Sequence, residues 1–212
     1  MTYRGYSSLT TLPLPNFEGR DDFQIWSPDG QSLLFTSSRE GNLAVYRVDV
    51  DGGEPVRLTE LGGNSTRPAW SPDGRKIAFM ADYDGGDVEI YVMDAAGGNV
   101  IRLTNSKGFD GYPAWSPDGM KIAFSSLRDG NNEIYAMNVD GSEQTNLTNS
   151  PDSREAIRGD FAWSPDGRQI LYHSDKTGNA DVYVMDADGK NQTNLTNNPA
   201  IDFSAIWVTL PQ

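Results

Sequence analysis

Short apolar runs alternate with polar, glycine-rich turns along the whole chain. Runs such as Ile77–Phe79 and Ile90–Met93 are rich in Val, Ile, Tyr and Phe, and Gly, Asp, Asn or Pro residues bound them. This composition is typical of β-strands. The dipeptide Asp-Gly recurs between the runs and favours tight hairpins, because glycine accepts a positive φ. No apolar period of about 3.6 residues persists over about ten residues, so we expect almost no helix.

The pattern is a tandem repeat. Each full unit holds Trp-Ser-Pro-Asp-Gly, then two apolar runs, a further turn and a closing Leu-Thr, and an additional Leu9-Thr10 precedes the first unit. Successive tryptophans are 44, 45, 48 and 44 residues apart, although the last one lacks the Ser-Pro-Asp-Gly that follows the others. Every tryptophan of the chain stands at this repeat position: Trp26, Trp70, Trp115, Trp163 and Trp207.

Each unit is predicted to form four short strands joined by three turns. Four antiparallel strands in about 45 residues, repeated in tandem, are typical of a β-propeller blade. We therefore expect one all-β domain over residues 1–212, a β-propeller with four complete four-stranded antiparallel blades and partial strands of a fifth. The expected blades span about 22–60, 66–105, 111–149 and 159–197, with an outer strand at about 6–13 and an inner strand at about 203–210.

Burial explains why such a unit repeats. A four-stranded sheet has two faces to cover, and radial stacking covers them with the neighbouring blades. We expect the recurring Trp, Phe or Tyr, and Tyr or Met positions to form this inter-blade core. Each large side chain buried there contributes about 1.5–3 kcal/mol.

The expected strands do not add up to a whole number of blades. The partial fifth blade has an inner and an outer strand but lacks the two strands between them, and neighbouring strands lie about 4.8 Å apart. Three interpretations remain open. The ring closes with a two-stranded blade, the chain is a segment of a longer propeller, or the ends pair with another copy, since unpaired strand edges favour such pairing.

The repeat resembles a known family. Trp-Ser-Pro-Asp-Gly, Ile-Ala-Phe, Ile-Tyr-Val-Met-Asp and Leu-Thr together look like the TolB-type propeller repeat, and similar repeats occur in propellers attached to prolyl-oligopeptidase-type peptidases. The resemblance covers roughly residues 6–210 and implies a protein-binding propeller, periplasmic as in bacterial TolB or otherwise soluble, so the compartment stays open. The chain differs from TolB in lacking the preceding α/β domain and in having fewer blades. Because one fold hosts many functions, the resemblance is more specific for fold than for function.

The composition of the chain argues against several classes of function. Thirty acidic residues against 17 basic ones give a net charge of −13. This charge argues against nucleic-acid binding and against attachment to an anionic membrane surface. The sequence shows neither a signal peptide nor an apolar stretch near 18 residues, so we expect no membrane insertion. With no cysteine and one histidine, disulfides, thiolate sites and multi-histidine metal sites are excluded.

Catalytic parts are scarce. His173 falls at the end of a predicted strand, where the other units have Thr36, Met80 and Ser125. No Gly-x-Ser-x-Gly segment supplies a nucleophile. We therefore expect His173 to be a variable repeat position and the protein not to be an enzyme.

The turns rich in Asp and Gly are weak candidates for structural calcium, because calcium prefers several oxygen ligands. No other cofactor is expected. The candidate ligands are Asp84, Asp87, Asp129 and Asp175.

Binding residues are expected in the loops that enter the inner strands, because loops on a rigid scaffold carry function. Arg and Tyr are frequent binding anchors. The alternative is that these residues are solvated and only cap strand ends. The candidates, expected to converge at the mouth of the central channel, are Asp22, Arg67, Asp110, Tyr112, Arg158 and Asp160.

The function expected from these observations is binding of a protein or peptide at that loop face. The acidic chain favours a basic partner. Two alternatives stay open: an accessory propeller of a larger enzyme whose catalytic domain is absent here, and a propeller that self-assembles into a homo-oligomer through its unpaired ends.

Overall fold

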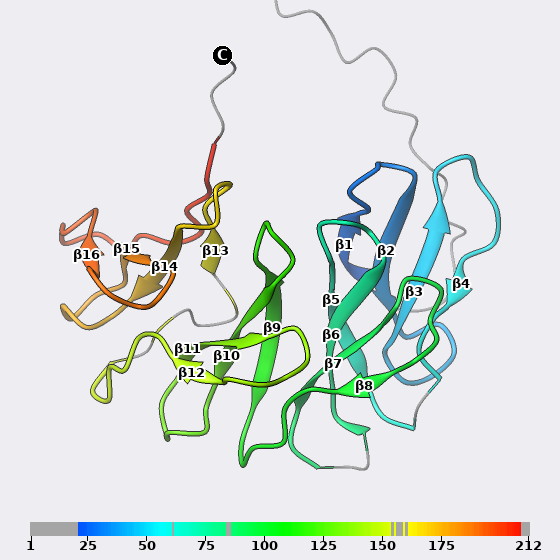
Figure 1. Cartoon of the computed structure of the whole chain (residues 1–212), viewed down its shortest axis with the longest axis horizontal. Helices are drawn as coiled ribbons and strands as arrows, with labels where there is room; N and C mark the ends of the chain where they lie inside the picture. The colour runs from blue at the N-terminus through cyan, green and yellow to red at the C-terminus, as the bar shows by residue number, and fades with distance from the viewer. Residues whose placement is uncertain are drawn as a thin grey trace, which may run out of the picture.

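The computed structural model describes residues 21–60, 62–83, 86–153, 155, 159 and 161–208. Within these residues sixteen strands form four four-stranded antiparallel sheets (Figure 1). The first sheet contains β1 (Asp21–Trp26), β2 (Ser32–Ser37), β3 (Ala44–Asp49) and β4 (Val56–Arg57). The second contains β5 (Ser65–Trp70), β6 (Lys76–Ala81), β7 (Glu89–Asp94) and β8 (Ile101–Arg102). The third contains β9 (Asp110–Trp115), β10 (Lys121–Ser126), β11 (Glu133–Asn138) and β12 (Thr145–Asn146). The fourth contains β13 (Phe161–Trp163), β14 (Gln169–Ser174), β15 (Asp181–Asp186) and β16 (Thr193–Asn194).

The predicted all-β blades are confirmed. In each sheet the strands lie in chain order and pair as antiparallel neighbours, with a two-residue outer strand at the end. No helix in the described part of the chain is long and apolar enough to cross a membrane.

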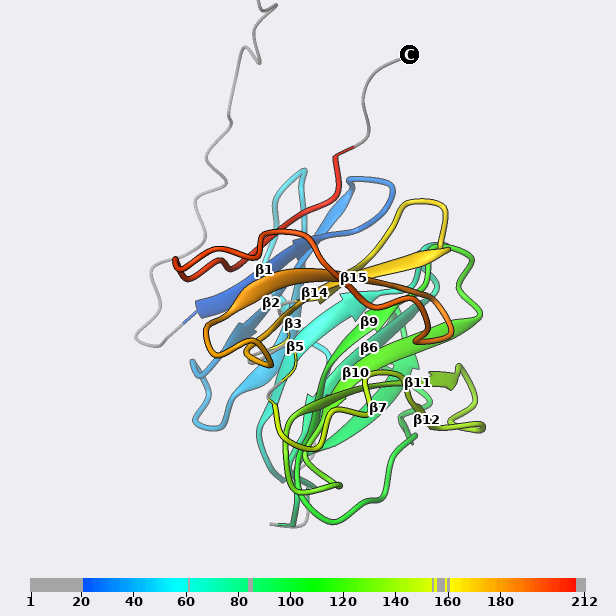
Figure 2. The same cartoon turned by 90° about the vertical axis from the view of Figure 1, so that its left-hand side faces the viewer.

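Successive sheets pack on one another through their first strands. β5 contacts β1, β2 and β3, β9 contacts β5, β6 and β7, and β13 contacts β9. The sheets therefore follow one another across the molecule, with the first and the fourth at opposite ends (Figure 1). Figure 2 views the same array from the side of the fourth sheet.

From the third sheet onward, the repeated tryptophan hydrogen-bonds to the preceding sheet, whereas the indole N–H of Trp70 in the second sheet is buried without a hydrogen-bond partner among the described residues. The indole Nε1 of Trp115 donates to the carbonyl oxygen of Ala69 at 3.1 Å, and that of Trp163 donates to Ala114 at 3.2 Å. Trp207 makes the same bond to Ala162 at 3.1 Å. By contrast, Trp26 on β1 is 55% exposed. The repeat position is therefore an inter-sheet connection, as the burial argument predicted.

Aromatic pairs and methionines fill the space between sheets. A ring on the second strand of each sheet lies beside a tyrosine on the third, with centroids 5.7 Å apart in all four sheets. Three of the four buried clusters draw on two successive sheets, as where Ile134 groups with Tyr172 and Met185, while the fourth, which holds Phe35 and Tyr46, lies within the first sheet. The pairs are Phe35–Tyr46, Phe79–Tyr91, Phe124–Tyr135 and Tyr172–Tyr183.

A glycine in the turn before the outer strand permits this close packing. Gly97 and Gly141 adopt φ values of 93° and 86°. A Cβ on them would lie only 3.0 and 2.9 Å from the carbonyl oxygens of Leu58 and Leu103, on the preceding sheet. Glycine is therefore required both for its backbone angle and for the approach of the neighbouring backbone.

The fifth blade is where the structure differs from expectation. Residues 203–208 form no strand, because none of the described strands hydrogen-bonds alongside them. Trp207 nevertheless keeps its indole bond, and Ser204 keeps a positive φ of 55°. The expected outer strand at 6–13 lies outside the described residues, as do 209 and 210.

Replacing Trp115 by alanine should lower the free energy of unfolding by about 3–5 kcal/mol, because the cavity and the lost indole bond loosen the second sheet from the third. Trp26→Ala is the matched control, and it should cost about 1 kcal/mol or less because that ring is largely exposed. Urea unfolding followed by circular dichroism measures both. Equal losses would contradict the inter-sheet role of the tryptophan.

Candidate functional site

The innermost strands β1, β5 and β9 each carry a bulge at the same place. The pairing with the second strand skips a residue between Asp22 and Ile25, between Thr66 and Ala69, and in β9 after Gly111. An extra residue in one strand bends it and re-aims a side chain. The bulged positions with positive φ are Phe23 (57°), Arg67 (54°) and Tyr112 (57°).

These three side chains stack on one another. The guanidinium carbon of Arg67 lies 3.6 Å from the ring centroid of Phe23 and 4.7 Å from that of Tyr112. A cation over an aromatic face contributes about 0.5–2 kcal/mol. On the fourth sheet Gly159 has φ 78°, and a Cβ there would lie 2.5 Å from the Cβ of Tyr112. We call Phe23, Arg67 and Tyr112 the aromatic–arginine ladder.

The ladder lines a groove of about 470 Å³ that draws on all four sheets. Its other walls include Ile25, Pro68, Pro113 and Phe161. Proline lacks an N–H and is tolerated on edge strands. The prolines directly after Arg67 and Tyr112 therefore fit an inner strand that pairs on one side only. The groove combines apolar walls with a guanidinium, a composition suited to binding.

The structure brings together two of the six predicted binding residues, Arg67 and Tyr112. Asp22 is half-buried on β1, next to Phe23 in the chain. Arg158 and Asp160 lie outside the described residues.

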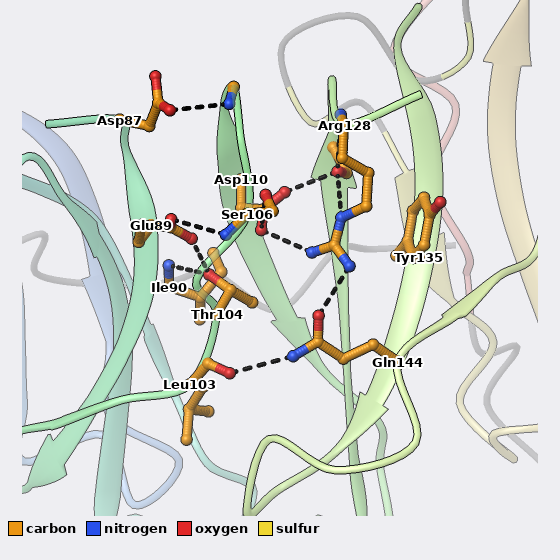
Figure 3. A network of polar contacts seen from close by, with 12 residues as sticks. Asp87, Glu89, Ile90, Leu103, Thr104, Ser106, Asp110, Arg128, Tyr135 and Gln144 are labelled. Atoms are coloured by element: carbon orange, nitrogen blue, oxygen red, sulfur yellow. Dashed lines mark hydrogen bonds and ion pairs between the residues drawn. The ribbon is translucent and has the colours of Figure 1, made fainter. Parts of the chain in front are cut away.

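Asp110, predicted as a binding residue, is fully buried and bonded within its own sheet (Figure 3). Its carboxylate lies 2.6 Å from Nη2 of Arg128 and accepts hydrogen bonds from Ser126 at 2.6 Å and Ser106 at 2.9 Å. These bonds occupy both carboxylate oxygens, so Asp110 acts as a structural anchor. Asp21 repeats the arrangement on the first sheet, 3.1 Å from Arg39.

Arg128 extends this anchor to the neighbouring sheet. Its Nη1 donates to Oε1 of Gln144 at 2.8 Å, and Nε2 of Gln144 donates to the carbonyl oxygen of Leu103 at 3.1 Å (Figure 3). The guanidinium also lies 4.5 Å from the ring centroid of Tyr135. The third sheet is thereby tied to the outer edge of the second.

The threonine of the closing Leu-Thr links a backbone N–H of the third strand to a buried carboxylate. Oγ1 of Thr104 accepts from the backbone N–H of Ile90 at 2.9 Å and donates to the buried Glu89 at 2.5 Å. Glu89 also accepts from Ser106 N at 2.9 Å and from Arg102 at 2.7 Å (Figure 3). Sequence reasoning missed these carboxylates, although an acid recurs there in three units. The same pairs recur as Thr148 with Glu133 and Thr196 with Asp181.

His173 is buried in β14, where its ring meets that of Phe203 edge-on at 5.4 Å. It therefore packs against the segment that carries Trp207.

The calcium candidates are spread apart. Oδ2 of Asp87 accepts from Gly108 N at 2.9 Å, and Asp129 accepts from Tyr135 and Asn146. Burial and the Asp129 carboxylate raise the pKa of Tyr135 to about 12. Asp175 is half-buried, and Asp84 lies outside the described residues. Nowhere in the described ranges do three or more acidic or histidine side chains gather as metal ligands.

Glu155 stands in the fourth sheet where Asp110 stands in the third, paired in register with Ser174. It is fully buried, and Ser153 donates to its Oε1 at 2.6 Å. Among the described residues, no arginine pairs with it as Arg128 pairs with Asp110. Burial therefore dominates and raises the pKa of the Glu155 carboxyl.

Comparison with known proteins shows what the repeat is similar to. Residues 60–157 match the family model of the TolB β-propeller domain. The structure of a putative TolB from Agrobacterium tumefaciens superposes with a TM-score of 0.71 and 30% identity, over 81% of this chain and 63% of that one. TolB from Acinetobacter baumannii superposes with a TM-score of 0.69 and 28% identity, over 84% and 44%.

A shorter match links the chain to a peptidase. A stretch of 68 residues, 32% of this chain, is 41% identical to the uncharacterized peptidase YuxL of Bacillus subtilis and spans 10% of its length. The chain thus covers less than two thirds of each of these relatives.

Asp110→Asn should lower the free energy of unfolding by about 3–5 kcal/mol, because Arg128 would keep its charge in a largely buried site without its partner. Asp140→Asn is the control, because this exposed carboxylate accepts its hydrogen bonds from the nearby Ser142. Urea unfolding at neutral pH measures both variants. A loss at Asp110 no larger than at Asp140 would overturn the structural role and restore Asp110 as a binding candidate.

Glu155 should make stability fall as the pH rises. Between the ordinary and the raised pKa, the folded chain holds a proton that the unfolded chain has lost, so raising the pH favours unfolding. Glu155→Gln should remove this contribution. The check is the difference in unfolding free energy between the two proteins from about pH 4 to 8. As the pH rises, the unfolding free energy of the variant should increase relative to that of the wild type. A difference that stays constant with pH would contradict the raised pKa of Glu155.

Proposed function

Starting from a chain that carries TolB-type β-propeller repeats, we propose that it binds a protein or peptide segment, without catalysis, in the groove along the aromatic–arginine ladder. The observation that carries this proposal is the repeated backbone strain at Phe23, Arg67 and Tyr112.

A left-handed backbone costs about 1–2 kcal/mol for a residue with a Cβ. It is uncommon for bulky residues and persists where the surroundings impose it, often at binding sites. Here it recurs in three consecutive blades, and each time it places a large side chain in the same groove. Ser204 has the same positive φ at the corresponding position of the last unit, so the backbone turn belongs to the repeat, and the first three blades differ in placing a large side chain there.

The ladder side chains are suited to recognition. Arginine and tyrosine are enriched at the centre of interfaces, because they combine a large contact area with hydrogen-bond donors. The apolar walls from Ile25, Pro113 and Phe161 add area that a partner can cover. Because the stack holds the guanidinium of Arg67 between two rings, little side-chain entropy remains to be lost on binding.

The charge of the molecule points to the chemistry of the partner. A net charge of −13 attracts basic segments and accelerates their encounter. This attraction acts through the field of the whole molecule, while apolar side chains of the partner can cover the prolines that line the groove. Association should therefore slow with added salt.

A second candidate rests on the match to the Bacillus subtilis peptidase. In that case the propeller is an accessory module of a larger enzyme and presents or admits substrate through the same groove. The length of the protein produced in the native organism separates the two, because an accessory role requires a catalytic domain in the same polypeptide.

Arg67→Ala and Tyr112→Ala should each weaken binding of peptides selected against the wild type from a displayed random library by about tenfold or more, because each removes a central contact. Arg168→Ala is the matched control, since this arginine is 85% exposed on another turn. Fluorescence anisotropy with synthetic copies of the selected peptides measures the affinities. Failure to enrich any peptide, or unchanged affinity in both ladder variants, would refute the proposal.

A further inference from the structure

A larger groove lies between the second and third blades, mainly at the opposite ends of the strands. It has a volume of about 690 Å³, and its walls include Val92, Ile101, Leu103, Trp115 and Val139. It shares only Pro72 and Trp115 with the ladder groove. It contains neither Arg67 nor Tyr112, so the two grooves can be altered separately.

A second groove of about 400 Å³ runs beside it, between the third and fourth blades. The two grooves share Asp118 and Met120, which belong to the turn between β9 and β10. This turn therefore forms a ridge with an apolar depression on each side. An extended peptide that crosses the ridge can place a side chain in both depressions.

Two exposed apolar side chains distinguish this place from the equivalent turns. Met120 is 65% exposed and Ile101 is 57% exposed, and both line the larger groove. Single exposed apolar residues are normal, but two on the walls of one groove form a surface that a partner can cover. The other units carry mostly polar residues at these positions: Gln31, Arg75 and Arg168 for Met120, and Val56, Thr145 and Thr193 for Ile101.

Carboxylates rim the same groove. Oδ1 of Asp118 accepts from Ser116 at 2.6 Å and from Met120 N at 3.0 Å. Oδ1 of Asp140 accepts from Ser142 Oγ at 2.6 Å and from its N at 3.0 Å. These bonds hold the pKa of both carboxyls below its usual value, so both stay charged. Lys76, which also lines this groove, lies 3.1 Å from Asp94.

We propose that the groove between the second and third blades binds an extended peptide segment in which apolar side chains alternate with lysine or arginine. The apolar side chains enter between Ile101, Met120 and Trp115, and the cations pair with Asp118 and Asp140. Methionine adapts its shape to different apolar side chains, so the groove selects a pattern of residues over a single sequence. The extended form fits because it sends alternate side chains to opposite sides.

The test uses a short fluorescein-labelled peptide of alternating leucine and lysine and measures its affinity by fluorescence anisotropy. The proposal predicts saturable binding that weakens with added salt. A peptide with glutamate in place of lysine, or with serine in place of leucine, should bind at least about tenfold more weakly. If the serine–lysine peptide bound equally well, charge alone would explain the attraction, and the proposal that the groove takes up apolar side chains would be wrong.

The variants exchange residues between repeat positions, so the folded state already accepts them elsewhere. Ile101→Thr copies Thr145, and Met120→Arg copies Arg75. Each variant should bind the leucine–lysine peptide about tenfold more weakly than the wild type does. Val56→Thr places a threonine at the corresponding position of the first blade, outside the groove, and should leave the affinity unchanged.

Two further variants test the contribution of the carboxylate and the independence of the two grooves. Asp118→Asn should weaken binding and flatten its salt dependence, because one ion pair is lost. Arg67→Ala should leave it unchanged, so a failure of the ladder groove and a failure of this groove are distinguishable. If Ile101→Thr and Met120→Arg bind like the wild type, or if the leucine–lysine peptide does not bind at all, the proposal is wrong.

Discussion

Every sheet of this protein depends on its neighbour, because a four-stranded antiparallel sheet with apolar side chains on both faces cannot cover itself. The indole of Trp115 shows how the dependence is met. Its ring fills the inter-sheet space, and its N–H satisfies the carbonyl oxygen of Ala69 on the preceding sheet. One side chain thus supplies both the nonspecific burial that holds two sheets together and the directional bond that sets their relative position.

Buried polar groups inside the blades also depend on neighbouring strands and sheets for their partners. Glu89 and Asp110 are buried carboxylates, yet hydroxyl, backbone and guanidinium donors surround each of them. A buried charge without such partners would destabilise the fold. Since these bonds join strands that are adjacent in one sheet, or sheets that are adjacent in the array, they select one register and oppose a slip between neighbours.

The blades were predictable because their signals are local. Tryptophan spacing, β-branched runs and Asp-Gly turns are all read within one unit, and they located most strands within a few residues. The role of Asp110 was not predictable in this way. It depends on Arg128, which lies 18 residues further along the chain and becomes a partner only through pairing of β9 with β10. The recurrence of Asp21 with Arg39 was the available signal. The ladder was half predictable: Arg67 and Tyr112 stood out by type, but no propensity favours a left-handed arginine or tyrosine.

The glycine before each outer strand has a geometric consequence. The turn at Gly141 packs almost directly on the backbone of Leu103, where there is no room for a side chain. This glycine therefore sets how closely the two blades approach each other. Gly97 and Gly189 make the corresponding close approach to Leu58 and Leu147, so the spacing is set separately at each of these junctions. A bulkier residue at this turn would change the arc of the whole array, whereas a change in a loop near the ladder would stay local. Residues of the loops around the ladder can therefore vary without disturbing the packing of one blade on the next.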